Sequence, residues 1–199
     1  MLARYDRAMQ SSPPTLVIVS GAPGSGKTTL AHRLASDLHL PLISKDELKE
    51  TLADAAGVPL DMAASMRLGA VAYAVLYFVA RQLLEAPTGV IIESNFRRGV
   101  SEPELRPLLA WSDAGLIQCT AASEVVLRRY DERHGRGDRH PAHLDADRAA
   151  TLADDLEAGL FEPLDLPIPI MVVDTTDGWS PRYEEICTFA ALPQAAARR

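Results

Sequence analysis

Short apolar runs alternate with segments of helical periodicity along the chain, and this alternation constrains the fold more than any other feature of the sequence. The strand-like runs lie at residues 15–20, 40–44, 88–94, 115–121 and 169–176. Helical patterns lie at 27–38, 46–55, 61–85, 101–111, 123–133 and 145–158, and a last one begins at residues 180–181 and fades near Pro193. Short, continuous apolar runs are typical of strands buried on both faces. The pattern therefore predicts an α/β fold with a five-stranded parallel sheet and helices on both faces.

Composition and charge limit the classes of protein to which the chain can belong. At 199 residues the chain is long enough for one domain, and we expect residues 1–199 to form it. The formal net charge of −7 argues against a protein that coats duplex DNA with a broad basic face. Two cysteines are too few for a disulfide framework, and the longest apolar run, residues 68–80, is too short to span a bilayer. We expect a cytoplasmic protein with no membrane partner, and the sequence leaves its oligomeric state open.

The first strand-like run ends in a glycine-rich loop that matches the pattern GxxxxGK[ST] and leads directly into a helical segment. A position between strand and helix is the context in which this pattern forms a phosphate-binding loop, or P-loop. Its glycines let backbone N–H groups curl around phosphate oxygens, and the helix N-terminus adds partial positive charge. The predicted nucleotide-binding residues are Gly21, Ala22, Pro23, Gly24, Ser25, Gly26, Lys27, Thr28 and Thr29.

Two side chains of this loop have predicted chemical roles. Lys27 reaches the β- and γ-phosphates, and the hydroxyl of Thr28 holds Mg²⁺. GTPases, motors, transporters and kinases share the loop, so the rest of the sequence must distinguish them. The guanine-reading motif NKxD is absent, because Asn95 is the only asparagine in the chain. This absence argues against a GTPase switch.

Asp46 follows the second strand-like run, in ISKDELK, near the expected position of the γ-phosphate. In phosphoryl transfer to an alcohol, an aspartate accepts the hydroxyl proton. We therefore predict that Asp46 is the general base. The alternative is a carboxylate that only complements the start of the helix. Lys45 and Lys49 flank it and either steady a phosphate or an anionic acceptor, or are solvated.

Glu93 ends the apolar run GVIIES, a position at which many P-loop proteins hold Mg²⁺ or its water. We predict that Glu93 and Thr28 bind the metal, with an ion pair as the alternative role of Glu93. Residues 95–98 follow at the same sheet edge, where a polar cluster would face acceptor or phosphate. The apolar stretch 62–78, with Tyr73 and Tyr77, is either core or the wall of an acceptor pocket.

An arginine-rich segment interrupts this acidic chain, and its members are Arg128, Arg129, Arg133, Arg136 and Arg139. They fall on a helix end and the loop after it, which predicts a lid over about residues 128–143 that closes over phosphates. We assign Arg133 and Arg136 to catalysis, because guanidinium groups neutralise transition-state charge, and Arg129 and Arg139 to nucleotide binding. The alternative is a solvated charged face. A metal site in the lid is disfavoured by the spacing and cationic neighbours of His134, His140 and His143.

The segments GAPGSGKTT, ISKDELK, IIESNF, an arginine-rich stretch ending RGDRH, and VVDTT occur in this order. Together they resemble the small P-loop kinases that include chloramphenicol phosphotransferase, polynucleotide 5′-hydroxyl kinases and zeta-type toxins. The resemblance covers most of the chain and implies a kinase-type core, with the third strand beside the first and ATP with Mg²⁺ as the phosphoryl donor. It also implies that Asp46 is the general base, that Arg133, Arg136 and Arg139 belong to the lid, and that residues 173–176 lie near the adenine.

The resemblance does not identify the phosphoryl acceptor. The acidic charge and the apolar, aromatic helical segment before the third strand favour a small hydroxylated metabolite, sugar or antibiotic. A nucleic-acid 5′-hydroxyl is the second reading, although outside the lid only Lys45, Lys49, Arg97 and Arg98 would offer a basic channel. A nucleotide sugar is the third. An ATP-binding regulatory protein remains the alternative from another class.

Overall fold

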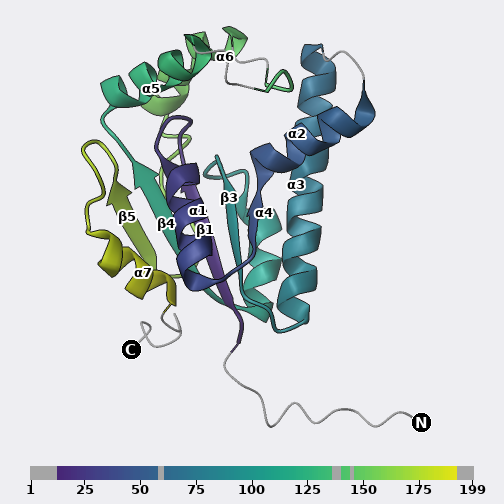
Figure 1. Ribbon diagram of the computed structural model, residues 1–199, viewed down its shortest axis with the longest axis vertical. Helices are drawn as coiled ribbons and strands as arrows, with labels where there is room; N and C mark the ends of the chain where they lie inside the picture. The colour runs from purple at the N-terminus through teal and green to yellow at the C-terminus, as the bar shows by residue number, and fades with distance from the viewer. Residues whose placement is uncertain (1–12, 58–60, 136–139, 144–145, 192–199) are drawn as a thin grey trace.

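The central layer is a five-stranded, all-parallel sheet with the strand order β2-β3-β1-β4-β5. The computed structural model describes residues 13–57, 61–135, 140–143 and 146–191. Figure 1 shows the sheet between helical layers, and its strands are β1 (Thr15–Gly21), β2 (Leu42–Ser44), β3 (Val90–Ser94), β4 (Asp113–Thr120) and β5 (Ile170–Asp174). The predicted parallel sheet is confirmed, as is the position of the third strand beside the first.

Helices cover both faces of this sheet. One face packs against α3 (Met62–Glu85), α4 (Glu102–Leu105) and the 3-10 helix η2 (Arg106–Trp111). The other face packs against α1 (Lys27–Leu38) and α7 (Tyr183–Ala191). The remaining helices lie at the carboxyl edge of the sheet (Figure 1) and are α2 (Lys45–Ala56), α5 (Ser123–Gly135) and α6 (Ala146–Glu157).

The alternation of side chains along β1 explains why its sequence is apolar at successive positions. Leu16 and Ile18 belong to the core on the α3 face, whereas Val17 and Val19 belong to the core on the α1 face. A strand buried on both faces needs apolar side chains in both directions. In register, Ile18 lies between Ile92 of β3 and Leu116 of β4. This double burial fixes the strand whose end carries the P-loop.

The segment 101–111, predicted as a single helix, is divided between α4 and the 3-10 helix η2. Pro107 stands near the start of η2 and has no N–H for an α-helical hydrogen bond to the preceding turn. The side chain of Ser101 makes no cap hydrogen bond at the start of α4, and its Oγ instead accepts a hydrogen bond from the backbone N–H of Arg97 at 2.9 Å. Ser101 therefore fastens the loop after β3 rather than a helix start.

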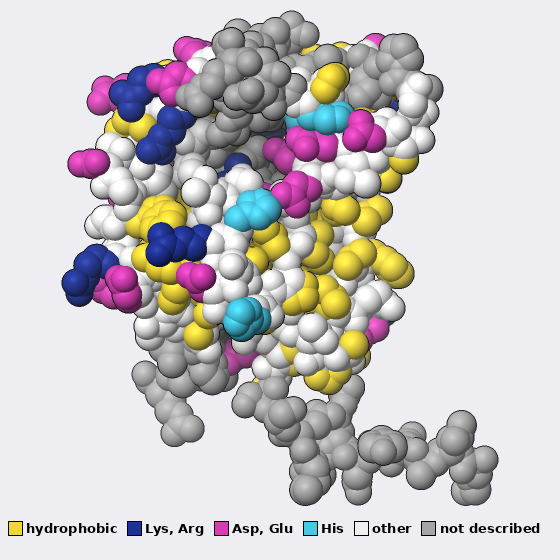
Figure 2. All heavy atoms as spheres, viewed as in Figure 1, with side chains coloured by type: hydrophobic (Ala, Val, Ile, Leu, Met, Phe, Trp, Pro, Cys, Tyr) yellow, Lys and Arg dark blue, Asp and Glu magenta, His cyan; other side chains and the backbone are white. Residues whose placement is uncertain are grey.

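The helix α3 begins and ends within one residue of the helical pattern predicted at 61–85, and it contains the apolar run 68–80. With 24 residues and an apolar composition, it is long enough to cross a membrane by length and composition alone. Its side chains Leu76, Ala80 and Leu84 are buried in the core against the sheet. These contacts pack one side of α3 on the sheet, whereas Met66, Val71 and Phe78 are exposed. Figure 2 shows hydrophobic side chains on the surface at the side of the molecule where α3 lies.

Candidate active site

The P-loop lies between β1 and α1, and its backbone requires glycine at two close approaches. Gly24 has φ +84°, and a Cβ there would lie 2.7 Å from the carbonyl oxygen of Val126. Gly21 has φ +149°, and a Cβ there would collide with the carbonyl oxygen of Cys119. Ser25 Oγ is buried inside the loop with no hydrogen-bond partner in the described part of the chain. The N-terminus of α1 also has no acidic residue in its first turn, which leaves its positive end available to an anion.

The two predicted metal-binding residues lie together at the carboxyl end of the sheet. The hydroxyl of Thr28 donates to Glu93 Oε1 at 3.2 Å, and Lys27 Nζ lies 3.5 Å from the same oxygen. Ser44 Oγ, at the end of β2, donates to Glu93 Oε2 at 2.7 Å. A hydroxyl beside a buried carboxylate supplies the hard oxygen ligands that Mg²⁺ takes. The residues present therefore fit Mg²⁺ that also takes oxygens from phosphate and water.

Asp46 lies in the first turn of α2, where Lys45 Nζ is 3.0 Å from its Oδ1. Burial by itself would raise the pKa of Asp46, but the positive charges of Lys45, His143 and Lys27 outweigh it and hold the pKa well below its usual range. Lys45 Nζ in turn lies 5.6 Å from the centre of the Tyr73 ring. Asp46 is therefore a carboxylate at neutral pH, able to accept a hydrogen bond from a hydroxyl.

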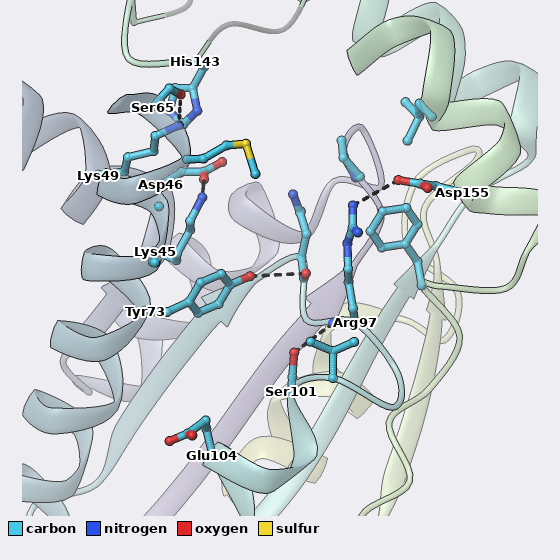
Figure 3. Close-up of a pocket in the computed structure, with 18 of the residues that line it drawn as sticks. Lys45, Asp46, Lys49, Ser65, Tyr73, Arg97, Ser101, Glu104, His143 and Asp155 are labelled. Carbon is cyan, nitrogen blue, oxygen red and sulfur yellow. Dashed lines mark hydrogen bonds and ion pairs between the residues drawn. The ribbon is translucent and has the colours of Figure 1, made fainter. Parts of the chain in front are cut away.

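Asp46 lines a cavity of about 670 Å³ that reaches the P-loop at Pro23. Figure 3 shows its walls, which come from α2 and α3 on one side and from the loop after β3 and the α5–α6 region on the other. The α3 residues Ser65, Tyr73 and Tyr77 line it at intervals of a helical face. Tyr73 also shares a 2.8 Å hydrogen bond with Ser94 Oγ. The aromatic helix is thus both core, through its buried side, and cavity wall.

The polar cluster after β3 divides between the cavity and the surface. Arg97 lines the cavity, where its guanidinium is 3.0 Å from Asp155 Oδ2 and lies over the Phe161 ring at 5.8 Å. Arg98 instead pairs with Glu162 at 2.8 Å, with its side chain half exposed. Of these two arginines, only Arg97 lines the cavity.

The arginines of the predicted lid occupy different places. Arg129 donates to the Thr175 carbonyl at 2.7 Å and to Thr175 Oγ1 at 3.0 Å, and approaches the Gly24 carbonyl at 3.4 Å. It thereby ties α5 to the P-loop and to the loop after β5. Arg128 is exposed and 3.8 Å from Glu132. Arg133 lies on α5, but its side chain is outside the described part, and Arg136 and Arg139 lie outside the described residues.

The described turn 140–143 of the lid segment contacts α2 and α3. His140 Nε2 is 3.0 Å from Asp54 Oδ1, and His143 Nε2 is 3.0 Å from Glu50 Oε1. Ser65 Oγ donates to the Ala142 carbonyl at 2.9 Å and accepts from Lys49 Nζ at 2.7 Å. The turn thus brings His143 into the cavity wall beside Asp46, a placement that the histidine spacing alone did not indicate.

Comparison with known proteins places the chain in a family. The family model of an AAA domain matches residues 16–158, which span the P-loop, Asp46, Glu93 and the arginine-rich segment. The chain belongs to this family. Its domain is a P-loop nucleotide-binding fold of kinase type, as the order of the motifs predicted.

Similar proteins include kinases and a protein without an assigned role. An adenylate kinase from Chlamydia abortus is 31% identical over 125 residues, which are 58% of each chain. An uncharacterized protein from Mycobacterium tuberculosis is 30% identical over 154 residues, 73% of this chain and 31% of that protein. The chain thus spans less than two thirds of the length of these relatives.

Solved structures give the same fold. A candidate kinase from Chloroflexus aurantiacus has a TM-score of 0.80 and 36% identity, covering 89% of this chain and 96% of its own. A gluconokinase from Sinorhizobium meliloti has a TM-score of 0.52 and 17% identity, covering 94% and 95%. The second likeness concerns the fold alone.

Proposed function

We propose that the chain is a cytoplasmic, single-domain ATP-dependent kinase that transfers the γ-phosphate to a hydroxyl group of a small molecule. One observation carries this proposal: the ionised Asp46 carboxylate lines a cavity that reaches the P-loop at Pro23. A hydroxyl bound in this cavity has a proton acceptor on one side and the phosphate-binding loop on the other. Kinase relatives support phosphoryl transfer, and the acceptor type comes from the cavity.

The chemistry assigns each group one task. The P-loop backbone and Lys27 hold the phosphates of ATP, and Thr28 and Glu93 would hold Mg²⁺, which neutralises phosphate charge when bound. Asp46 orients the acceptor hydroxyl and takes its proton. The acceptor oxygen forms a bond to the γ-phosphorus as the bond to the β–γ bridging oxygen breaks, which leaves ADP and a phosphate ester.

The lid arginines complete the proposal. Arg133 and Arg136 would neutralise charge on the transferring group, while Arg129 and Arg139 would contribute to nucleotide binding. The contacts of Arg129 support its role, because they link the P-loop to Thr175, which lies within the segment 173–176 that would contact the adenine. Closure of such a lid also keeps water from the transferring group.

Nucleic-acid 5′-hydroxyls are the second class of acceptor to test, because Lys45, Lys49 and Arg97 line the cavity. Two of these cations are already paired with carboxylates, Lys45 with Asp46 and Arg97 with Asp155. A small molecule with few anionic groups is therefore the better-matched acceptor.

The test measures ADP formation with Mg²⁺ for the wild type and Asp46→Asn across hydroxylated antibiotics, sugars, nucleosides and 5′-hydroxyl oligonucleotides, with products identified by mass. We expect one class to gain a phosphate, with turnover about 10²- to 10⁴-fold lower in Asp46→Asn. Asp165→Asn, which changes an exposed aspartate outside the cavity, is the matched control. Steady ATP hydrolysis that is indifferent to every acceptor and to Asp46 would instead indicate a regulatory ATPase.

A further inference from the structure

Charge is distributed unevenly along the acceptor cavity. Lys45, Lys49 and His143 lie at the end that holds Asp46, whereas Glu104 lies at the opposite end (Figure 3). Arg97 and Asp155, on the wall that faces Tyr73, pair with each other at 3.0 Å. In the part of the chain that the structure describes, Glu104 has no hydrogen-bond or ion-pair partner. The end where phosphate arrives is therefore rich in cations, and the far end presents a carboxylate.

The Glu104 carboxylate acts on the aromatic wall next to it. Burial, the neighbouring Tyr73 and the charge of Glu104 together raise the pKa of Tyr77, whose phenol therefore stays neutral. A carboxylate beside aromatic rings offers a cation both an ion pair and contact with a π face. This combination is suited to a protonated amine.

The middle of the cavity is apolar. The α3 wall presents Gly69 and Ala70 beside Tyr73 and Tyr77, whose stacked rings have centroids 5.9 Å apart. Phe161 lines the opposite side. These surfaces match a hydrocarbon or aromatic group between the two polar ends.

Two of the most exposed large hydrophobic side chains also belong to this cavity. Met66 is 61% exposed and Val100 is 66% exposed, and both line its wall. A molecule with an apolar body would cover them and remove their apolar surface from water. A volume of about 670 Å³ lies within the range for drug-sized ligands, so the cavity has room for such a body.

On the basis of the proposed function, we propose that the acceptor is an amphipathic amino alcohol. Its hydroxyl lies at Asp46, its apolar body lies against Tyr73 and Tyr77, and its protonated amine pairs with Glu104. A carboxylate or phosphate in place of the amine would meet Glu104 with like charge. The same cavity therefore discriminates against sugar acids and against extended polynucleotides.

Three probes that share a rigid 4-(hydroxymethyl)biphenyl core test this proposal. They are 4′-(aminomethyl)biphenyl-4-methanol, its neutral N-acetyl derivative, and 4′-(hydroxymethyl)biphenyl-4-carboxylate. Binding is measured by titration calorimetry with a non-hydrolysable ATP analogue and Mg²⁺ present, and phosphorylation is measured separately with ATP by product mass. We expect the ammonium probe to bind about fivefold more tightly than the neutral one, as for a partly exposed ion pair, and the carboxylate probe to bind most weakly.

Substitutions at Glu104 and Gly69, with Glu157 as a control position, separate the effect of charge from the effect of shape. Glu104→Gln should remove the preference for the ammonium probe, and Glu104→Lys should reverse it in favour of the carboxylate. Glu157→Lys makes the same change in net charge at an exposed residue outside the cavity and should preserve the wild-type order. Gly69→Leu should weaken all three probes while Gly69→Ala has little effect, since a Cβ at Gly69 meets no atom within 4 Å.

The two readouts keep this inference distinct from the proposed function. If the preference for the ammonium probe depends on Glu104 but no phosphorylated product forms, the binding assignment is retained and the kinase proposal is overturned for this class of acceptor. Phosphorylation of all three probes at equal efficiency would retain the kinase and overturn the amino-alcohol inference. Absence of binding by every probe, or an unchanged order in Glu104→Lys, would also overturn it.

Discussion

The hydroxyl of Thr28 donates to Oε1 of Glu93 across 3.2 Å, which joins the first turn of α1 to the end of β3. These residues are 65 positions apart in sequence, and β1 and β3 bring them together by pairing in parallel. Glu93 is 2% exposed and is also contacted by Lys27 and Ser44. The carboxylate is therefore the point at which the P-loop, β2 and β3 meet.

Replacement of the Glu93 carboxylate should impair Mg²⁺-dependent activity more than it destabilises the fold. In Glu93→Gln we expect kcat to fall by at least about tenfold and half-maximal activity to require more Mg²⁺, because one hard anionic ligand is lost. Titration of activity with Mg²⁺ checks this. Ser44→Ala, which removes the hydrogen bond to the other oxygen, is the milder comparison, and an unchanged Mg²⁺ dependence in Glu93→Gln would contradict the metal assignment.

The ion pair between Lys45 and Asp46 predicts a pH effect with a definite sign. The pKa of Asp46 is lowered from its ordinary value of 3.8, so the stability contributed by this charge is complete above that pH and is lost only as the pH falls toward the folded-state pKa. In Lys45→Met, burial is opposed by less positive charge and the pKa of Asp46 should rise. The acid limb of the profile of kcat/KM against pH should then move to higher pH.

Lys45→Arg retains the positive charge and is the matched control for this profile. Measurement between about pH 4 and 8, with urea unfolding alongside, separates catalysis from stability. An acid limb at the same pH in Lys45→Met and in the wild type would show that Lys45 does not set the ionisation of Asp46.

Arg129 should contribute to both stability and nucleotide affinity. Its guanidinium links Thr175 and the Gly24 carbonyl, so Arg129→Ala leaves those acceptors without a donor. We expect a loss of about 1–3 kcal/mol in the free energy of unfolding and weaker ATP binding. Arg128→Ala removes a neighbouring, exposed arginine and should change little. Equal behaviour of the two variants by thermal unfolding and ATP titration would exclude the linking role.

Alanine substitutions at two glycines separate the cost of a left-handed backbone from the cost of a steric clash in the P-loop. Gly24→Ala places a Cβ in the left-handed region and against the Val126 carbonyl, whereas Gly57→Ala at φ +60° meets no atom within 4 Å. Gly57→Ala is the control, and it should lower the free energy of unfolding by only the cost of placing alanine in the left-handed region, about 1–2 kcal/mol. Gly24→Ala should lower the free energy of unfolding further and also weaken ATP binding. Equal destabilisation in urea unfolding, with ATP affinity preserved, would show that the loop shifts freely.

The sequence predicted the features that depend on local patterns. The P-loop is specified by glycines and a lysine within one short segment, and the buried strands are specified by continuous apolar runs such as residues 15–20. The division of residues 101–111 was missed because Pro107 acts on hydrogen bonding within a segment whose apolar periodicity is otherwise helical. Asp46 was singled out from its position after a strand, and its proposed role as base still awaits the kinetic test.

Distances across the sheet edge could not be read from the chain, because they depend on which strands pair and how helices pack. Ser44 looks like an ordinary strand end in the sequence, and only the pairing of β2 with β3 brings it to Glu93. Ser65 and His143 likewise acquire their place beside Lys49 and Asp46 from the docking of the turn 140–143 on α2 and α3. Local patterns thus determined the P-loop and the strands, whereas packing between distant segments decided the shape and charge of the cavity beside Asp46.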